Sequence, residues 1–327
     1  MIDFIIGGIQ KKPGLKSLRI LLIIPFIAFG GYLLKNPIGG ASKLIAGFNS
    51  EFIEREDGFV GLSKLYDLPL DIKEMEISLM YSALYNKDVD VIDGFSTDGR
   101  IKEFNLKSLN DDKSYFPPYY AAPVVNGKTL QKYPQIEIVL NELAGIISNE
   151  MMAGLNYEVD GDKKDLGEVA HTFLRSIGIE SDPKAGSSND YDIVIGSKAF
   201  TENFLLAHLF AQVIESKSNL KTKLELGFGG TKLIFDALKL QEIDLYPEYT
   251  GTGYLVLLQK NATEVSDFTN PEIIYQDVKY EFRSRYDLHW MKPLGFNNTF
   301  ALMMRTEHAD SLNIHSISDL SKYLKSK

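Results

Sequence analysis

Short apolar runs alternate with segments of helical periodicity from about residue 41 to the end of the chain. The apolar runs predict strands at residues 43–48, 89–92, 192–196, 223–226 and 243–246. The periodic segments predict helices at residues 74–86, 133–145, 165–177, 201–216, 231–240 and 316–325. Ser316 and Asp319 have the spacing of a capping box at the start of the last helix. Strands alternating with such helices predict an α/β fold with parallel sheets and crossover helices, in which ligands bind beyond the carboxyl ends of the strands.

A long apolar stretch, Leu18–Leu34, precedes this region. As a helix its 17 residues would span roughly 25 Å, somewhat short of a bilayer core, so an anchor and an export signal both fit. Four basic residues lie between residues 11 and 19 and Lys35 alone follows closely, so the positive-inside rule keeps residues 1–17 cytoplasmic. A buried core helix is the alternative. We favour an uncleaved transmembrane helix at residues 18–34, which predicts a single-pass cell-membrane protein with the remainder extracytoplasmic.

The composition of the chain excludes several classes of function. Its 327 residues, enough for about two domains, carry a formal net charge of −9, which argues against a nucleic-acid-binding surface. The chain has no cysteine, which excludes disulfides, thiol catalysis and Cys-ligated metals. Its five histidines show no ligand-like pairing, so we expect no metal site, and no motif predicts a cofactor.

One sequence pattern occurs twice in the chain. The segments ALYNKDVDVIDGFSTDG (83–99) and ALKLQEIDLYPEYTGTG (237–253) align without gaps, at a constant offset of 154 residues. Each runs from a helix end through an acidic strand to an aromatic residue, Phe95 in the first copy and Tyr249 in the second. A chance match between two helix–strand units is the alternative. The repeat predicts two similar lobes that present aromatic side chains to a ligand between them.

Several longer segments carry a resemblance to a known family. From residue 191 onward they are IVIGSKAFTENFLLAHLFAQVIE, GFGGT, EIDLYPEYTGT and GFNNTFAL. Between residues 41 and 177 they are FNSEFIEREDGF, DVDVIDGFSTDGRIKEFNL, LNDDKSYFPPYYAAPVVN and LNYEVD. In these segments the chain resembles the glycine betaine/choline-binding proteins of osmoprotectant ABC transporters. The resemblance implies a two-lobed periplasmic-binding-protein type II fold and a binding protein that is not an enzyme.

The order of the resembling segments is reversed relative to the family. Residues 191–327 resemble the first half of the family's sequence, and residues 41–175 resemble the second half. The chain is therefore similar to a circular permutant, in which a linker rich in Ser, Gly, Pro and Asp at residues 180–190 joins the family's old termini. The alternative is half of one binding domain followed by half of another, with the halves closing between chains.

The permuted order implies a specific division into lobes. One binding lobe combines residues 41–119 with residues 299–327, and the second lobe is residues 120–298. It also implies that Lys322, near the end of the last helix, lies close to Lys43 at the start of the first strand.

The expected ligand is a quaternary ammonium compound, which has no N–H group to donate. Aromatic faces can bind its charge instead, at about 2 kcal/mol or more each once desolvated. The resemblance implies a cage of four rings, Tyr249 and Phe300 from one half of the sequence and Phe95 and Tyr119 from the other. Where the family often has tyrosine, Phe95 and Phe300 lack the hydroxyl. Core packing is the alternative for each ring taken alone.

A betaine also carries a carboxylate. Lys198 lies just before a predicted helix start, where free N–H groups favour anions, and Arg55 can offer a planar fork to a carboxylate. The resemblance implies this role for both, with Thr252 as a hydroxyl donor, whereas solvated surface charges are the alternative. Asn298 stands beside the cage where relatives can carry an acid, and its neutrality favours a zwitterion over a bare cation such as choline.

These features together predict a membrane-tethered receptor that closes on glycine betaine or a related zwitterion, with choline, carnitine and proline betaine as further candidates. The resemblance implies delivery of this solute to an ABC permease with its ATPase, through an open–closed equilibrium. Two other functions stay open from the sequence. One is a solute sensor that signals to a membrane partner, and the other is an enzyme on the same fold, for which no acid–base or nucleophile set is evident.

Overall fold

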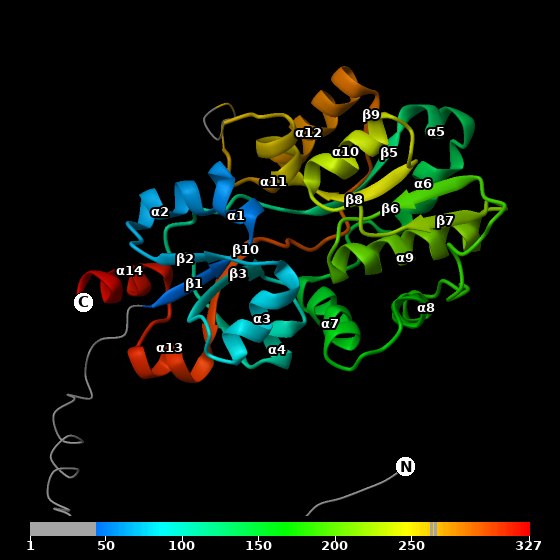
Figure 1. Cartoon of the computed structure of the whole chain (residues 1–327). Coiled ribbons are helices and arrows are strands. Elements are labelled where there is room, and N and C mark those ends of the chain that lie inside the picture. Colours follow the sequence, from blue (N-terminus) through cyan, green and yellow to red (C-terminus); the bar gives the residue numbers. More distant parts are fainter. Residues whose placement is uncertain (1–43, 262–263, 265–266) are drawn as a thin grey trace, which may run out of the picture. The chain divides into compact units, whose positions relative to one another are not determined.

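Two five-stranded sheets organise the part of the chain that the computed structural model describes, residues 44–261, 264 and 267–327 (Figure 1). The first sheet has the order β2 (Asp71–Glu74), β1 (Ile45–Phe48), β3 (Val91–Phe95), β10 (Phe300–Arg305), β4 (Leu106–Ser108). The second sheet has the order β7 (Thr222–Glu225), β6 (Ile193–Gly196), β8 (Leu245–Tyr249), β5 (Ala121–Asn126), β9 (Leu288–Trp290). We call residues 44–119 and 299–327, around the first sheet, lobe 1, and residues 120–298, around the second sheet, lobe 2.

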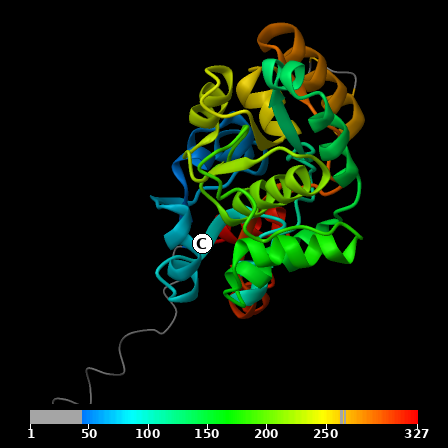
Figure 2. The same cartoon turned by 90° about the vertical axis from the view of Figure 1, so that its right-hand side faces the viewer.

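Helices pack around both sheets (Figures 1 and 2). Those of lobe 1 are α1 (Ser50–Glu54), α2 (Gly61–Tyr66), α3 (Ile77–Tyr85), α4 (Arg100–Glu103), α13 (Thr306–Leu312) and α14 (Ile317–Lys325). Those of lobe 2 are α5 (Gly127–Lys132), α6 (Gln135–Leu140), α7 (Asn149–Asp160), α8 (Leu166–Ser176), α9 (Thr201–Lys217), α10 (Thr231–Lys239), α11 (Thr250–Thr252) and α12 (Pro271–Tyr286). Irregular helical turns are η1 (Glu56–Val60), η2 (Asn141–Leu143) and η3 (Gly253–Leu257). The predicted two-lobed α/β fold is confirmed.

Both sheets are mixed, whereas the sequence predicts parallel sheets. β1 pairs in parallel with β2 and β3, and β6 pairs in parallel with β7 and β8, as expected for strands joined by crossover helices. However, β10 runs antiparallel to β3 and β4, and β5 runs antiparallel to β8 and β9. The prediction of parallel sheets is wrong at these strands because β5 and β10 enter their sheets from the other lobe, without a crossover helix.

The internal repeat has the same structure in both lobes. α3 with β3, and α10 with β8, keep the sequence offset of 154 at all of their boundaries. Asp90 Oδ2 accepts a hydrogen bond from Ile45 N at 3.1 Å, and its counterpart Asp244 Oδ2 accepts one from Val194 N at 2.8 Å. The strand order is also the same, because β2-β1-β3-β10-β4 corresponds to β7-β6-β8-β5-β9. A chance sequence match does not account for these shared boundaries and contacts.

Two predicted helices differ from the observed elements. The helix predicted at residues 133–145 is shorter than expected, because α6 begins only after Pro134 and ends at Leu140. Pro134 has no backbone N–H and disfavours a helical conformation at the residue before it, so a helix cannot run through Tyr133. The helix predicted from Glu74 begins only at Ile77, because Glu74 belongs to β2. The sequence does not reveal β2, since all of its residues are exposed and show no apolar pattern.

Two chain segments cross between the lobes and lie side by side. Tyr120 forms an antiparallel bridge with Asn297, and Asn298 N donates to Tyr119 O at 3.0 Å. Asn297 Oδ1 also accepts a hydrogen bond from Tyr119 N at 2.6 Å. Because the backbones of both crossings are paired here, Tyr119 and Asn298 hold fixed positions at the boundary between the lobes.

The last helix returns the C-terminal end of the chain to lobe 1. Its predicted capping box is confirmed, since Asp319 N donates to Ser316 Oγ at 3.1 Å and Ser316 N donates to Asp319 Oδ2 at 3.0 Å. Ser321 Oγ donates to Asp67 O, at the end of α2, at 3.1 Å. In Figures 1 and 2 the red C-terminal helices accordingly lie beside the blue and cyan part of the same lobe.

The circular permutation and the N-terminal anchor stay predictions. Lys43, whose distance from Lys322 would test the permutation, and the apolar stretch 18–34 both lie outside the described residues. Within residues 44–261, 264 and 267–327, no helix has both the length and the apolar character needed to cross a bilayer.

A buried carboxylate on β3 fixes the start of α1, the helix that leads into the site. Asp93 is fully buried and accepts hydrogen bonds from Asn49 N at 2.9 Å and from Asn49 Nδ2. Asn49 in turn caps α1, because its Oδ1 accepts from Phe52 N at 3.0 Å. Burial raises the pKa of Asp93 to about 7, although the hydrogen bonds from Asn49 act against this rise.

Asp93 should make the protein less stable as the pH rises from about 4 to about 7. The unfolded chain releases this proton near pH 4 and the folded chain near pH 7, so between these values the folded state holds the extra proton. We expect Asp93→Asn to remove this dependence. Between pH 5 and pH 7.5 the unfolding free energy of the wild type should fall by roughly 2 kcal/mol relative to that of the variant.

Urea unfolding at the two pH values measures this shift. The control is Asp88→Asn, the same substitution at an exposed residue of the same lobe. Equal pH dependence in wild type and Asp93→Asn would contradict the assignment.

Candidate functional site

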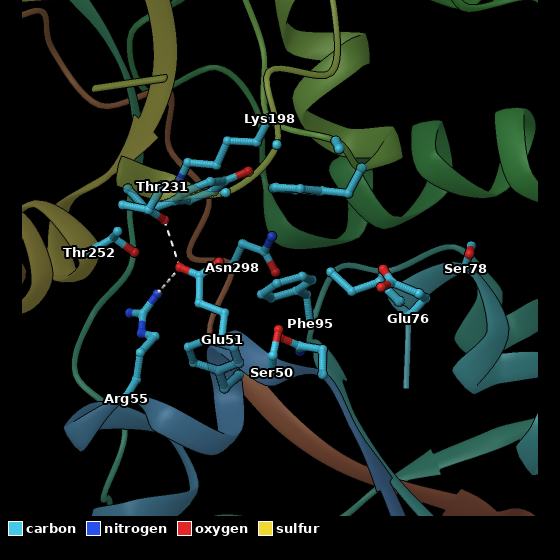
Figure 3. A pocket seen from close by; sticks show the side chains of 18 of the residues that line it. Ser50, Glu51, Arg55, Glu76, Ser78, Phe95, Lys198, Thr231, Thr252 and Asn298 are labelled. Atoms are coloured by element: carbon cyan, nitrogen blue, oxygen red, sulfur yellow. Dashed lines mark hydrogen bonds and ion pairs between the residues drawn. The ribbon is translucent and has the colours of Figure 1, made fainter. Parts of the chain in front are cut away.

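One cavity of about 430 Å³ lies between the lobes, at the carboxyl ends of the parallel strands β1, β3, β6 and β8 (Figure 3). All of the residues that the sequence analysis selects line it, namely Arg55, Phe95, Tyr119, Lys198, Tyr249, Thr252, Asn298 and Phe300. The remaining lining residues are Asn49, Ser50, Glu51, Met75, Glu76, Ile77, Ser78, Ala199, Phe200, Gly229, Gly230 and Thr231. The structure thus brings together every selected residue, and their part in ligand binding stays a prediction.

The four predicted cage rings belong to one continuous row of aromatic contacts. The ring centroid of Phe300 lies 5.3 Å from that of Phe95 and 5.7 Å from that of Tyr119. A further ring, Phe200, stacks on Phe95 at 5.3 Å and on Tyr249 at 6.3 Å. Because these rings line the cavity, they offer it apolar surface and the electron-rich faces that attract cations.

Phe200 is a cavity residue that the sequence analysis misses. It is the N-cap residue of α9 and follows Lys198 by two positions, within the segment SKAFTEN. The sequence does contain a signal for it, since Phe200 is an aromatic residue at a strand-to-helix junction, as Phe95 and Tyr249 are. Comparing β6 with β3 and β8 would have found it.

Arg55 lies beside the cavity with its guanidinium held by two carboxylates. Its Nε donates to Asp57 Oδ1 at 2.7 Å, its Nη2 donates to Asp57 Oδ2, and its Nη1 donates to Glu51 Oε1 at 3.0 Å. Burial acts to lower the pKa of Arg55, but the hydrogen bonds and charge of Asp57 outweigh it and raise the pKa above its ordinary value. The guanidinium carbon lies 5.1 Å from the centroid of Phe300. Arg55 is therefore a fixed cation against the ring of Phe300.

Lys198 forms a second buried ion pair on the opposite side of the cavity. Its Nζ donates to Glu248 Oε1 at 2.6 Å and lies 5.3 Å from the ring centroid of Tyr249. The side chains of Lys198 and Glu248 are 8% and 0% exposed, and that of Arg55 is 9% exposed. The alternative that Lys198 and Arg55 are solvated surface charges is therefore excluded.

Glu202 on α9 is a buried carboxylate beside Tyr249, and the sequence analysis also misses it. Its Oε1 accepts hydrogen bonds from Tyr249 OH at 2.8 Å and Asn298 Nδ2 at 2.7 Å. Its Oε2 accepts from Thr97 Oγ1 and from Asn156 Nδ2, the latter at 3.0 Å. Burial raises the pKa of Glu202, and these four hydrogen bonds act to lower it. Since two donors face each oxygen, the geometry is that of an ionised carboxylate.

Thr252 and Asn298 complete the set of selected residues. Thr252, at the end of α11, is 4% exposed. Next to it, a β-carbon at Gly251 would lie 2.6 Å from Tyr119 Cδ1, so only glycine allows this close approach of α11 to the cage ring. Asn298 Oδ1 is buried and has no hydrogen-bond partner among the described residues, although Asn298 Nδ2 donates to Glu202.

Direct contacts join the lobes on both sides of the cavity. On one side, Thr231 Oγ1 at the start of α10 donates to Glu51 Oε1 at 2.8 Å. On the other side, Asn156 Nδ2 donates to the backbone oxygen of Thr97 at 2.8 Å, and Arg100 forms an ion pair with Asp160 at 3.9 Å. The described arrangement is therefore one in which the lobes are closed on each other.

Among the described residues, no group of three or more His, Asp or Glu side chains is arranged to hold a metal ion.

A family model and several relatives match this chain. The model described as the substrate binding domain of ABC-type glycine betaine transport system (OpuAC) matches residues 32–176 and 191–327. The carnitine transport binding protein OpuCC of Listeria monocytogenes is 46% identical over 136 residues, 41% of this chain and 44% of that protein. The glycine-betaine-binding protein of Pseudomonas aeruginosa is 37% identical over 150 residues, 45% of this chain and 48% of that protein.

A third relative and a solved structure extend the comparison. The ergothioneine transport permease/ergothioneine binding protein EgtU of Helicobacter pylori is 40% identical over 134 residues, 41% of this chain and 24% of that protein. The chain thus spans less than half the length of each of these three relatives. A crystal structure of a glycine betaine/carnitine/choline ABC transporter is 38% identical, covers 41% of this chain and 49% of that chain, and has a TM-score of 0.33.

Loss of the Glu202 carboxylate should destabilise the fold. Glu202→Ala leaves the donors of Thr97, Asn156, Tyr249 and Asn298 without their acceptor in a buried place. We expect the unfolding free energy measured in urea to fall by about 3 kcal/mol. Glu242→Ala, at an exposed glutamate of the same lobe, is the control and should change it by less than about 0.5 kcal/mol. A loss equally small for Glu202→Ala would show that the network does not stabilise the fold.

Proposed function

We propose that this chain, which belongs to the family of substrate-binding domains of ABC-type glycine betaine transport systems, binds a quaternary ammonium zwitterion of the glycine betaine kind in the cavity between its lobes. The proposal includes delivery of this ligand to an ABC permease with its ATPase. The members of the family are binding proteins of transporters and not enzymes. The observation that carries the proposal is that four rings from distant parts of the sequence, Phe95, Tyr119, Tyr249 and Phe300, line one cavity.

The electrostatics around the rings suit a permanent cation. A trimethylammonium group cannot donate a hydrogen bond, so it needs electron-rich faces and nearby acceptors rather than a paired donor. Tyr249 lies between the cavity and the ionised Glu202, whose charge polarises its ring through the hydroxyl. Asn298 Oδ1, a buried acceptor without a partner among the described residues, adds a partial negative charge at the same wall.

The cavity wall also carries two cations that can face a carboxylate. Arg55 and Lys198 are buried cations on the cavity wall, and the hydroxyls of Thr231 and Thr252 belong to the same lining. A small molecule that carries both an ammonium and a carboxylate would therefore find aromatic faces and cations on the walls of one cavity. This arrangement supports a zwitterion as the ligand.

Closure of the lobes supports a role in delivery. The contacts from Glu51 to Thr231 and from Thr97 to Asn156 connect the lobes only when the cavity between them is closed. A ligand that contacts both lobes shifts the open–closed equilibrium towards the closed state. A permease can bind this closed state selectively, and no covalent reaction is needed. We further propose that residues 18–34 anchor the chain in the cell membrane with the binding lobes on the extracytoplasmic side.

Removal of the Tyr249 ring tests the cage. We expect Tyr249→Ala to weaken glycine betaine binding at least about tenfold in titration calorimetry, because one desolvated cation–π contact is lost. Tyr280→Ala is the matched control, since Tyr280 is 71% exposed on α12 of the same lobe and should leave the affinity unchanged. An unchanged affinity in Tyr249→Ala would remove this ring from the binding site. Absence of binding of any quaternary ammonium compound to the wild type would overturn the proposed function.

A further inference from the structure

Glu51 occupies a position in the cavity that is built for an anion. Its Oε1 accepts hydrogen bonds from Arg55 Nη1 at 3.0 Å and from Thr231 Oγ1 at 2.8 Å, so that the carboxylate lies between the two lobes (Figure 3). Thr231 is the first residue of α10, where unpaired backbone N–H groups also favour negative charge. Burial acts to raise the pKa of Glu51, but the charges of Arg55 and Lys198 outweigh it and lower the pKa below its ordinary value. Glu51 is therefore ionised at neutral pH.

The two cations of this cavity are already neutralised without Glu51. Arg55 has Asp57 as a bidentate partner, and Lys198 has Glu248, with both carboxylates buried. Glu51 is therefore a third carboxylate opposite two cations. Glu202, behind the cage, adds a further negative charge. The closed cavity carries an excess of negative charge, which attracts a bare cation and opposes an additional carboxylate.

We propose that Glu51 is a resident competitor for the carboxylate of the ligand, and that it determines the preference of the site between zwitterionic and purely cationic quaternary ammonium compounds. The inference rests on the proposed function and goes further, because it names the residue that selects between two ligand classes. A zwitterion must displace the Glu51 carboxylate from Arg55 and Thr231 or bind against its charge. A cation without a carboxylate leaves Glu51 in place and gains from it.

The local structure lets Glu51 leave its position. Its side chain is 40% exposed, whereas that of its partner Arg55 is 9% exposed. It belongs to the first turn of α1, a helix of five residues whose capping bond comes from Asn49 and does not involve Glu51. Rotation of this one side chain frees Arg55 Nη1 and the Thr231 hydroxyl together. It does not disturb the bidentate pair of Arg55 with Asp57.

Charge removal at Glu51 tests the inference. In the full-length protein, Glu51→Gln should raise the affinity for glycine betaine about tenfold and lower the affinity for choline about threefold in titration calorimetry. The ratio of the two affinities is the readout, because a merely structural role would move both in the same direction. Glu54→Gln is the control, since Glu54 is an exposed residue of the same helix and should leave the ratio unchanged.

The outcomes separate this inference from the proposed function. A wild type that binds neither compound overturns both. A wild type that binds either compound, together with a Glu51→Gln variant whose affinity ratio is unchanged or reversed, overturns the inference and leaves the proposed function standing. Glu51→Ala, which also removes the hydrogen bonds, should change the ratio in the same direction as Glu51→Gln. The melting temperature of each variant verifies that it is folded.

Discussion

The buried carboxylate of Glu202 is the interaction on which the geometry of the site depends. It takes a hydrogen bond from Thr97 of lobe 1, from Asn156 and Tyr249 of lobe 2, and from Asn298 at the crossing between them. An ionised carboxylate is costly to bury, and one of the four donors that offset this cost, Thr97, reaches Glu202 only while the lobes are together. The orientation of the Tyr249 ring and the closure of the lobes are therefore linked through one side chain.

The two cations of the cavity are likewise buried together with groups that compensate their charge. Arg55 and Lys198 can be buried because Asp57 and Glu248 are buried with them. The sequence did not predict these two ion pairs, because no local pattern indicates which carboxylate pairs with Arg55 or with Lys198. The consequence for binding is substantial. A ligand does not meet two free cations, because each of them is already paired with a buried carboxylate and Glu51 adds a further negative charge.

The sequence was sufficient for the two-lobed α/β fold and for the positions of the selected residues around one cavity. It succeeded there because the repeat and the family resemblance mark strand ends such as those of Phe95 and Tyr249, and strand ends meet in this fold. It failed where local patterns are weak or misleading. β5 contains Pro123, which argues against a central strand, and β10 is buried on both faces and shows no alternation. Glu202 was missed because its role depends on contacts that only the folded chain makes, whereas Phe200 does carry a sequence signal, its place at a strand-to-helix junction.

The pairing of β4 sets the order in which the protein can be completed during synthesis. In its sheet β4 pairs only with β10, which lies between β4 and β3. This edge of lobe 1 therefore cannot form until residues 300–305 have left the ribosome. Lobe 2, by contrast, has all of its strands by residue 290. The second lobe can therefore form its core co-translationally. The first lobe waits for residues 300–305 with an unpaired strand exposed, the stage at which a nascent chain is most prone to aggregate.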